Sequence, residues 1–114
     1  MPDRFSVQKS ESGEATVLRV AGELDLASSP ELERELDGIL AGAGGPLIVD
    51  LRELEFIDST GLRVLVKAHQ QAEERGRRFG LAGGGSQVRR LLNLTGIGER
   101  LAVASSPEEL LAGD

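Results

Sequence analysis

A chain of 114 residues can form one folded domain, and its formal net charge of −6 disfavours a nucleic-acid partner, whose phosphates it would repel. The absence of cysteine excludes disulfides and thiolate metal sites, one histidine is too few for a histidine-clustered zinc site, and three aromatic residues argue against base stacking. No apolar run approaches the roughly 20 residues of a membrane span, and residues 1–10 lack the apolar core of a signal peptide, so we expect a cytoplasmic protein that contacts neither membrane nor DNA.

The amino-terminal part of the chain is predicted to form a β-hairpin. Phe5 and Val7 alternate with polar residues, as in a short strand, and residues 10–13 are a cluster of turn formers. Residues 15–21 are rich in Val, Leu and Thr and predict a second strand, which the short connection would pair with the first. Gly22 weakens the strand pattern, so we expect the chain to leave the sheet there.

A helix is expected after this hairpin. Ser28 stands three residues before Glu31, the spacing of a capping box, whereas Ser29 directly precedes Pro30, which suits the first helical position. The pattern leaves both starting registers open. The helix would end at residues 43–46, where glycines and a proline stop it, and its apolar face would consist of Leu32, Leu36, Ile39 and Leu40.

In the middle of the chain, strand-type patterning changes to helix-type patterning. Residues 47–49 are a short apolar run typical of a strand buried on both faces, and residues 50–58 are interpreted as a link with a polar end. A helix is predicted from about residue 60 to residue 75, with Gly76 as its stop. Its side chains at helical spacing are Leu62, Leu65, Val66, His69 and Ala72.

The last part of the chain continues the alternation of strands and helices. Its expected elements are, in order, a weaker strand over residues 77–82, a glycine loop over 83–85, a short helix capped by Ser86, a break over 95–98, a last strand over 101–103 and a helix that begins at 106–109. Alternation after a hairpin indicates parallel strand pairing. We therefore predict one α/β domain over residues 1–114, with a mixed, mostly parallel sheet, an N-terminal hairpin and about four helices.

Asp58, Ser59 and Thr60 stand where the strand pattern gives way to the helix pattern. Each could cap the helix by accepting a bond from an unpaired amide of its first turn, and capping is the commoner role for such residues. One cap suffices, however, and a spare hydroxyl at Ser59 would lie beside amide donors and partial positive charge that suit a phosphate. Gly61 would leave room for another molecule beside that hydroxyl, and Leu62 would offer it an apolar contact.

The segment VDLRELEFIDSTGLRVLV, residues 49–66, resembles the signature of the STAS domain found in bacterial anti-sigma factor antagonists. The likeness extends to residues 21–25, 88–97 and 106–110, so it covers nearly the full chain. The run Asp-Ser-Thr-Gly-Leu at residues 58–62 is quite specific for this family in this order of elements.

This resemblance implies a regulatory protein that an enzyme modifies. Ser59 matches the family's phosphoacceptor, Thr60 the neighbouring hydroxyl position and Asp25 an acidic position close to the acceptor. The unphosphorylated protein would bind an anti-sigma factor that is also a serine kinase and so release the sigma factor. Phosphorylation of Ser59 would end that binding, and a phosphatase would reset it. We expect no cofactor, metal or catalytic residue, and the partner would contact Asp25, Asp58, Ser59, Thr60, Gly61 and Leu62.

Two alternatives differ from this hypothesis in kind. Some branches of the family are adaptor subunits of stressosomes or lipid-transport complexes, and the motif does not separate them. A serine hydrolase would need a base near Ser59, but the chain has only His69, roughly 15 Å further along the same helix. Residues 58–61 are also not a nucleophile elbow, so we predict that the chain is not an enzyme and that His69 is a hydrogen-bonded core or boundary residue.

Two further clusters are given structural interpretations. Residues 83–86 could cradle a phosphate but lack the lysine of a P-loop, so we interpret them as a plain loop. Arg75, Arg77 and Arg78 are interpreted as a solvated helix end, where cations suit the helix dipole, rather than as a nucleic-acid site.

Overall fold

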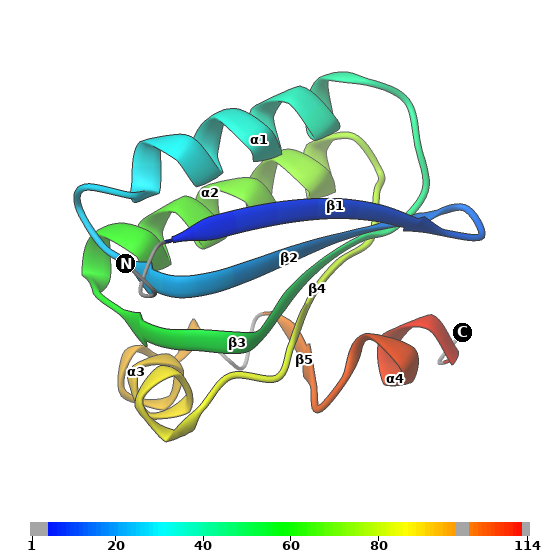
Figure 1. Ribbon diagram of the computed structural model, residues 1–114. Helices are drawn as coiled ribbons and strands as arrows, with labels where there is room; N and C mark the ends of the chain where they lie inside the picture. The colour runs from blue at the N-terminus through cyan, green and yellow to red at the C-terminus, as the bar shows by residue number, and fades with distance from the viewer. Residues whose placement is uncertain (1–4, 98–100, 113–114) are drawn as a thin grey trace.

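The elements follow one another along the chain in the predicted order (Figure 1). The computed structural model describes residues 5–97 and 101–112. Its elements are β1 (Ser6–Ser12), β2 (Ala15–Leu24), α1 (Ser29–Ala41), β3 (Leu47–Ile57), α2 (Ser59–Glu74), β4 (Phe79–Ala82), α3 (Ser86–Thr95), β5 (Ala102–Ala104) and α4 (Pro107–Ala112). The predicted break after α3 begins at Gly96, whose φ is 76°, and residue 98 of that break lies outside the described residues.

In the part of the chain that the structure describes, the strands form one sheet in the order β1-β2-β3-β4-β5. β1 and β2 pair antiparallel, with Ser12 opposite Ala15 beside the turn, and the other neighbouring strands pair parallel. β3 is central, because Leu47 pairs with Thr16 of β2 on one side and with Phe79 of β4 on the other. The predicted mixed, mostly parallel sheet with an N-terminal hairpin is therefore confirmed.

The helices cover the sheet in two pairs, and Figure 1 shows α1 and α2 on one face and α3 and α4 on the other. The predicted apolar face of α1 is confirmed, since Leu32, Leu36 and Leu40 are at most 1% exposed and Ile39 is half-buried against the same core. These side chains belong to one core with Leu65 of α2 and with five strand residues, Leu18, Val20, Leu47, Val49 and Leu51. Burial of this aliphatic surface holds α2 against the sheet and thereby positions its first turn.

β3 is longer than predicted, because residues 50–57 belong to the strand and are not a link. Its register against β2 shifts twice, each time because β3 holds one residue more than β2, as in a β-bulge. Each shift changes which side chains point toward the core. The alternation of apolar and polar residues that would indicate a strand is therefore interrupted in the sequence. β2 also continues through Gly22, whose φ is 92°, and the chain leaves the sheet only after Leu24.

The loop between β2 and α1 uses both serines that were predicted as alternative caps. Ser28 stands in the cap position and Ser29 is the first residue of α1, so the register that begins at Ser28 is correct and the one at Ser29 is wrong, but neither side chain accepts a bond from the first turn of the helix. Ser28 Oγ instead donates to the backbone oxygen of Glu23 (2.7 Å), and Ser29 Oγ donates to that of Asp25 (2.6 Å). The two hydroxyls therefore order the loop that carries Asp25 rather than the helix that follows it.

The predictions for the other helix ends have mixed outcomes. α4 begins as predicted, because Ser106 Oγ accepts a bond from Glu109 N (3.4 Å). α2 is followed by Gly76, the predicted stop, at a φ of 68°. The prediction for Ser86 is wrong, since this serine is the first residue of α3 and the preceding Gly85 stands in the cap position.

Arg77 is a structural residue and not part of a solvated helix end, which corrects that interpretation. Its Nη1 donates to the carbonyl oxygens of Ile39 (2.8 Å) and Gly42 (3.3 Å), and its Nε donates to that of Gly45 (2.9 Å). The last carbonyls of a helix lack partners within the helix, and a cation suits their partial negative charge. Arg77 therefore closes the carboxyl end of α1.

Candidate functional site

The candidate site lies where β2 and β3 end beside each other and α2 begins. Leu24 and Ile57 are paired at the ends of these strands, and Asp58 N donates to Leu24 O (3.1 Å). Asp25 follows Leu24 directly, and Ser59 follows Asp58 directly. The fold therefore brings the two acidic residues and the serine to one edge of the sheet, as the sequence predicted.

A side chain of α3 supports this edge of the sheet. β4 pairs with β3 only as far as Asp50, so the end of β3 has no strand neighbour on that side. Gln87 takes the place of one, because its Oε1 accepts from Ile57 N (3.0 Å) and its Nε2 donates to Ile57 O (2.9 Å). The sequence analysis missed Gln87, since one glutamine in an amphipathic helix carries no local signal of such a role.

Asp58 is the residue that caps α2. Its Oδ1 accepts a bond from Gly61 N (3.0 Å), and its backbone is extended, as expected of an N-cap. Ser59 is then the first residue of the helix, and its side chain is exposed. Within residues 5–97 and 101–112 no group forms a hydrogen bond with the Ser59 hydroxyl, whereas the neighbouring Thr60 is half-buried. Of the three candidates, Ser59 alone has an exposed side chain and takes no part in the cap.

Gly61 is required by the packing of the chain against itself. A Cβ at this position would lie 2.6 Å from Leu24 Cγ and 2.9 Å from Leu24 O. This corrects the interpretation that the missing side chain leaves room for another molecule, because the space is already filled by β2. The contact lets the first turn of α2 approach the end of β2 closely, and so it sets the position of Ser59.

Leu62 does not offer an apolar contact to a partner, because its side chain is 4% exposed and belongs to the core. Position 62 is three residues after Ser59 and faces the sheet, whereas Ser59 faces solvent. The apolar side chains exposed near the site are instead Leu26, which is 72% exposed, and Phe56, which is 38% exposed. Leu26 follows Asp25 and Phe56 precedes Ile57, so both flank the strand ends that carry the site.

The carboxylate of Asp25 shapes the loop that carries Leu26. Its Oδ1 accepts bonds from Ala27 N (3.0 Å) and Ser28 N (3.1 Å), as in an Asx turn. The side chain is half-buried and sits at the edge of the sheet that also carries Ser59. Asp25 therefore contributes negative charge to the site and also fixes the position of an exposed leucine beside it.

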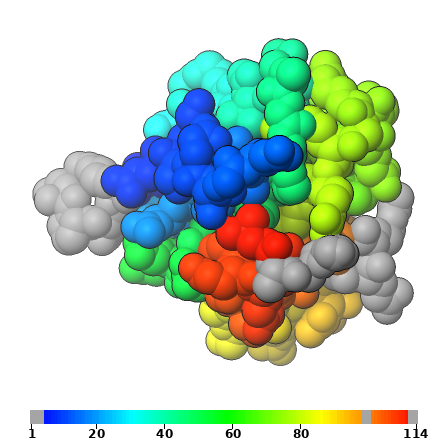
Figure 2. All heavy atoms as spheres, turned by 90° about the vertical axis from the view of Figure 1, so that its right-hand side faces the viewer, coloured from blue at the N-terminus to red at the C-terminus, as the bar shows by residue number. Residues whose placement is uncertain are grey.

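A second concave region, which the sequence analysis missed, lies on the opposite face of the sheet. Figure 2 shows the N-terminal hairpin (blue) and α4 (red) side by side, and a groove of about 540 Å³ runs between them. Its lining on the sheet side is mostly polar. It includes Gln8, Ser10, Ser12, Arg19, Asp50 and Arg52, together with the apolar Val17. The groove is mixed in charge, and it lies away from Ser59.

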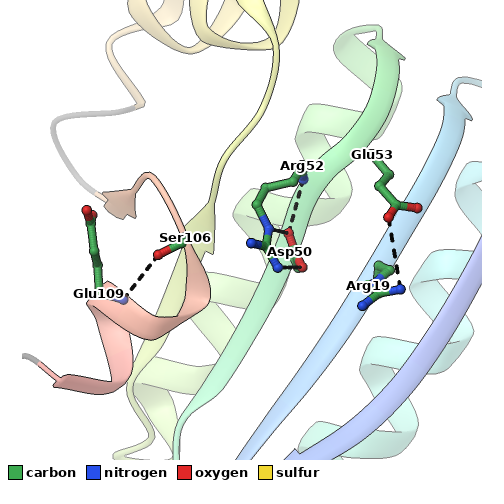
Figure 3. A network of polar contacts seen from close by, with 6 residues as sticks. All are labelled: Arg19, Asp50, Arg52, Glu53, Ser106 and Glu109. Carbon is green, nitrogen blue, oxygen red and sulfur yellow. Dashed lines mark hydrogen bonds and ion pairs between the residues drawn. The ribbon is translucent and has the colours of Figure 1, made fainter.

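Asp50 is the buried carboxylate in this groove, and Figure 3 shows it beside Arg52. Arg52 Nε and Nη2 donate to its two oxygens at 3.0 and 2.9 Å, and Arg52 N donates at 3.1 Å. Burial tends to raise the pKa of Asp50, but the hydrogen bonds and charge of Arg52 outweigh it, so the pKa lies below its ordinary value. The sequence analysis missed this pair, because it interprets residues 50–58 as a link and not as part of a strand.

His69 lies ten residues after Ser59 on α2, at the boundary of the core. Its Nε2 is 3.5 Å from Glu73 Oε2, and its ring packs on Phe79 with centroids 6.0 Å apart. Its contacts are thus with its own helix and with β4, away from the serine. The predicted boundary position is confirmed, but its buried Nδ1 has no hydrogen-bond partner among the described residues, so the predicted hydrogen bonding is wrong. Among the described residues, no helix has the length and apolar character needed to cross a membrane, and no cluster of His, Asp and Glu could hold a metal ion.

Comparison with known proteins gives consistent matches over most of the chain. A family model described as "Mlab, STAS domain" matches residues 7–106. The chain is 29% identical over 112 residues to the anti-sigma-F factor antagonist RsfB of Mycobacterium tuberculosis, covering 98% of this chain and 91% of that protein. It is 31% identical over 91 residues to the anti-sigma-B factor antagonist of Listeria monocytogenes, covering 80% of each. A crystal structure of an anti-sigma factor antagonist from Mycobacterium paratuberculosis superposes with a TM-score of 0.89 at 26% identity, covering 97% of this chain and 94% of that one.

Proposed function

Because this chain belongs to the STAS-domain family, as the match over residues 7–106 establishes, we propose that it is an anti-sigma factor antagonist switched by phosphorylation of Ser59. The chain is a regulatory protein and not an enzyme, like the antagonists to which it is similar. In its unphosphorylated form it binds an anti-sigma factor and so releases the sigma factor. The observation that carries the proposal is the exposed Ser59 hydroxyl, which stands at the start of α2 while Asp58 does the capping.

The binding surface of this proposal consists of the side chains around the two strand ends. Asp25, Asp58, Ser59 and Thr60 provide its polar part, and Leu26 and Phe56 provide exposed apolar area. Gly61 and Leu62 act behind this surface, because they are buried and hold α2 against the sheet. A polar surface with a few exposed apolar side chains is the composition expected of a reversible interface.

Phosphate ends the binding for an electrostatic reason. Phosphorylation adds about −1.5 to −2 charges at a position beside the carboxylates of Asp58 and Asp25. A partner packed over Leu26 and Ser59 would have to bury that charge next to two others of the same sign, which is costly without a matching cation. A penalty of about 2.7 kcal/mol is enough to weaken binding a hundredfold.

The partner of this proposal is an anti-sigma factor that also has serine kinase activity. The Ser59 Oγ would attack the γ-phosphorus of ATP, the bond to the ADP oxygen would break, and a base of the kinase would accept the hydroxyl proton. A phosphatase would hydrolyse the phosphoserine and restore the binding form. We further propose a cytoplasmic location, where the sigma factor and ATP are both present.

The proposal is tested by incubating the protein with its cognate kinase and ATP and mapping the phosphate by mass spectrometry. Phosphate is expected on Ser59, and the variant Ser59→Ala is expected to fold, to remain unphosphorylated and to keep binding the partner. Ser59→Asp is expected to bind more weakly, and Thr60→Ala serves as the control for the neighbouring hydroxyl. Phosphate found only on another residue would show that the site is wrong.

A second function stays open because the description of the matched family model, "Mlab, STAS domain", does not name an antagonist. In this alternative the protein is an adaptor subunit of a stressosome or a lipid-transport complex. Such a subunit would hold its partner whether or not Ser59 carries phosphate. Pull-down with the phosphorylated and unphosphorylated protein separates the two functions, because only the antagonist loses its partner on phosphorylation.

A further inference from the structure

The solvent-facing side of α2 carries a basic side chain one turn after Ser59. Arg63 is four residues further along the helix, and both side chains are exposed. Residues four apart on a helix have Cβ atoms about 5–6 Å apart on the same face. Helical side chains also lean toward the amino end of the helix, so Arg63 leans toward Ser59.

Arg63 has no ion-pair or hydrogen-bond partner in the part of the chain that the structure describes. Three other cations of the molecule are engaged in the fold. Lys67, the next residue on this side of α2, pairs with Glu33 of α1, and Arg52 and Arg77 are bound to Asp50 and to the end of α1. The guanidinium of Arg63 is therefore available beside an exposed hydroxyl.

We propose that Arg63 is the internal counter-charge of phosphorylated Ser59 and binds the phosphate oxygens with its guanidinium. This inference rests on the proposed phosphorylation of Ser59. A guanidinium presents its donors in a planar fork that matches two phosphate oxygens, and a long exposed side chain can reach across one helical turn to use it. No other residue of α2 that is three or four positions from Ser59 is basic.

The pair would determine where the phosphate lies. Asp58, which is bound to Gly61 N at the cap, repels the phosphate from one side, while Arg63 attracts it from the other. The dianion would therefore lie along the first turn of α2, on its solvent side. That is the side that a partner covering Ser59 would have to approach. The single positive charge of Arg63 offsets only part of the phosphate's charge, so negative charge remains in the partner's path.

The test uses protein in which phosphoserine is inserted at position 59 during translation, so that no kinase is needed. The phosphate is titrated by 31P NMR at low salt in the otherwise wild-type protein and in Arg63→Gln. We expect the second titration midpoint, ordinarily near pH 6, to rise by about 0.2–0.4 of a pH unit when the arginine is removed, as for an exposed helical pair. Arg34→Gln, which removes an exposed arginine of α1, is the matched control and should leave the midpoint unchanged.

Two further measurements make the result decisive. Arg63→Lys keeps the charge without the fork and should give an intermediate midpoint, which also covers the case in which Arg63→Gln folds poorly. About 1 M salt should remove most of the difference between wild type and Arg63→Gln, because it screens an exposed pair. Equal midpoints for wild type and Arg63→Gln at low salt would overturn the proposal. A kinase that ignores Ser59 would instead overturn the proposed function without affecting this titration.

Discussion

Three of the four residues from Asp58 to Gly61, around the start of α2, have separate roles. Asp58 caps the helix, Gly61 allows the first turn to touch Leu24, and Ser59 between them keeps an exposed hydroxyl. A serine that capped its own helix would have its oxygen engaged with an amide and would be a poorer phosphoacceptor. The division of roles is what makes Ser59 the candidate for modification.

The packing of Gly61 predicts the stability of a simple variant. Gly61→Ala should gain up to about 1 kcal/mol in helix propensity but lose more through the contact of its Cβ with Leu24, for a net destabilisation of about 1–2 kcal/mol. Gly38→Ala is the control, because Gly38 lies within α1 with no atom in the path of a Cβ, and it should stabilise the protein. Urea unfolding gives the free energy of unfolding of both variants. If Gly61→Ala stabilised the protein as much as Gly38→Ala does, the packing argument would be contradicted.

At the scale of elements, β3 links the two faces of the molecule. Its bulged half ends at the candidate site, where Gln87 replaces a missing strand neighbour. Its first half carries Asp50 into the groove on the other face of the sheet, where Arg52 neutralises it (Figure 3). A buried carboxylate is stable there only because this arginine satisfies both of its oxygens.

The Asp50–Arg52 pair predicts a pH-dependent contribution to stability. The pKa of Asp50 is lowered in the folded protein by Arg52, so the stabilisation is present at neutral pH and is lost as pH falls through that lowered pKa. Asp50→Asn should therefore destabilise the protein by about 1–2 kcal/mol at pH 7, and the difference from wild type should shrink below about pH 4. Glu53→Gln is the control, since Glu53 forms only a half-exposed pair with Arg19 at 4.0 Å. Urea unfolding at several pH values gives the comparison, and a gap between Asp50→Asn and wild type that did not change with pH would contradict the assignment.

At the scale of the whole molecule, the two faces of the sheet and its edge have different roles. α1 and α2 build most of the core on one face, and the other face leaves a polar groove beside α4 (Figure 2). The edge at the ends of β2 and β3 carries the exposed apolar side chains of Leu26 and Phe56 together with Ser59. A partner that bound this edge, as proposed, would leave the core untouched.

This arrangement predicts that binding and stability can be changed separately. Leu26→Ala should weaken the binding of the unphosphorylated protein to its partner about tenfold, because apolar contact area is lost at the interface, while unfolding by urea is unchanged. Leu111→Ala is the control, because Leu111 is an exposed leucine of α4 that lines the groove and not this edge. This variant should change neither the affinity for the partner nor the stability to urea. Calorimetric titration with the partner measures the affinities. Undiminished binding by Leu26→Ala would exclude the β2–α1 loop from the interface.

The amino-acid sequence alone determined the order of elements, the hairpin, the apolar face of α1 and the motif at residues 58–62. Each of these depends on periodicity or on residues close together in the chain. Tertiary structure alone decided the length of β3, the burial of Leu62, the closure of α1 by Arg77 and the contact that requires Gly61. Each of these depends on which distant segment packs against the residue, and local sequence patterns carry no record of that neighbour.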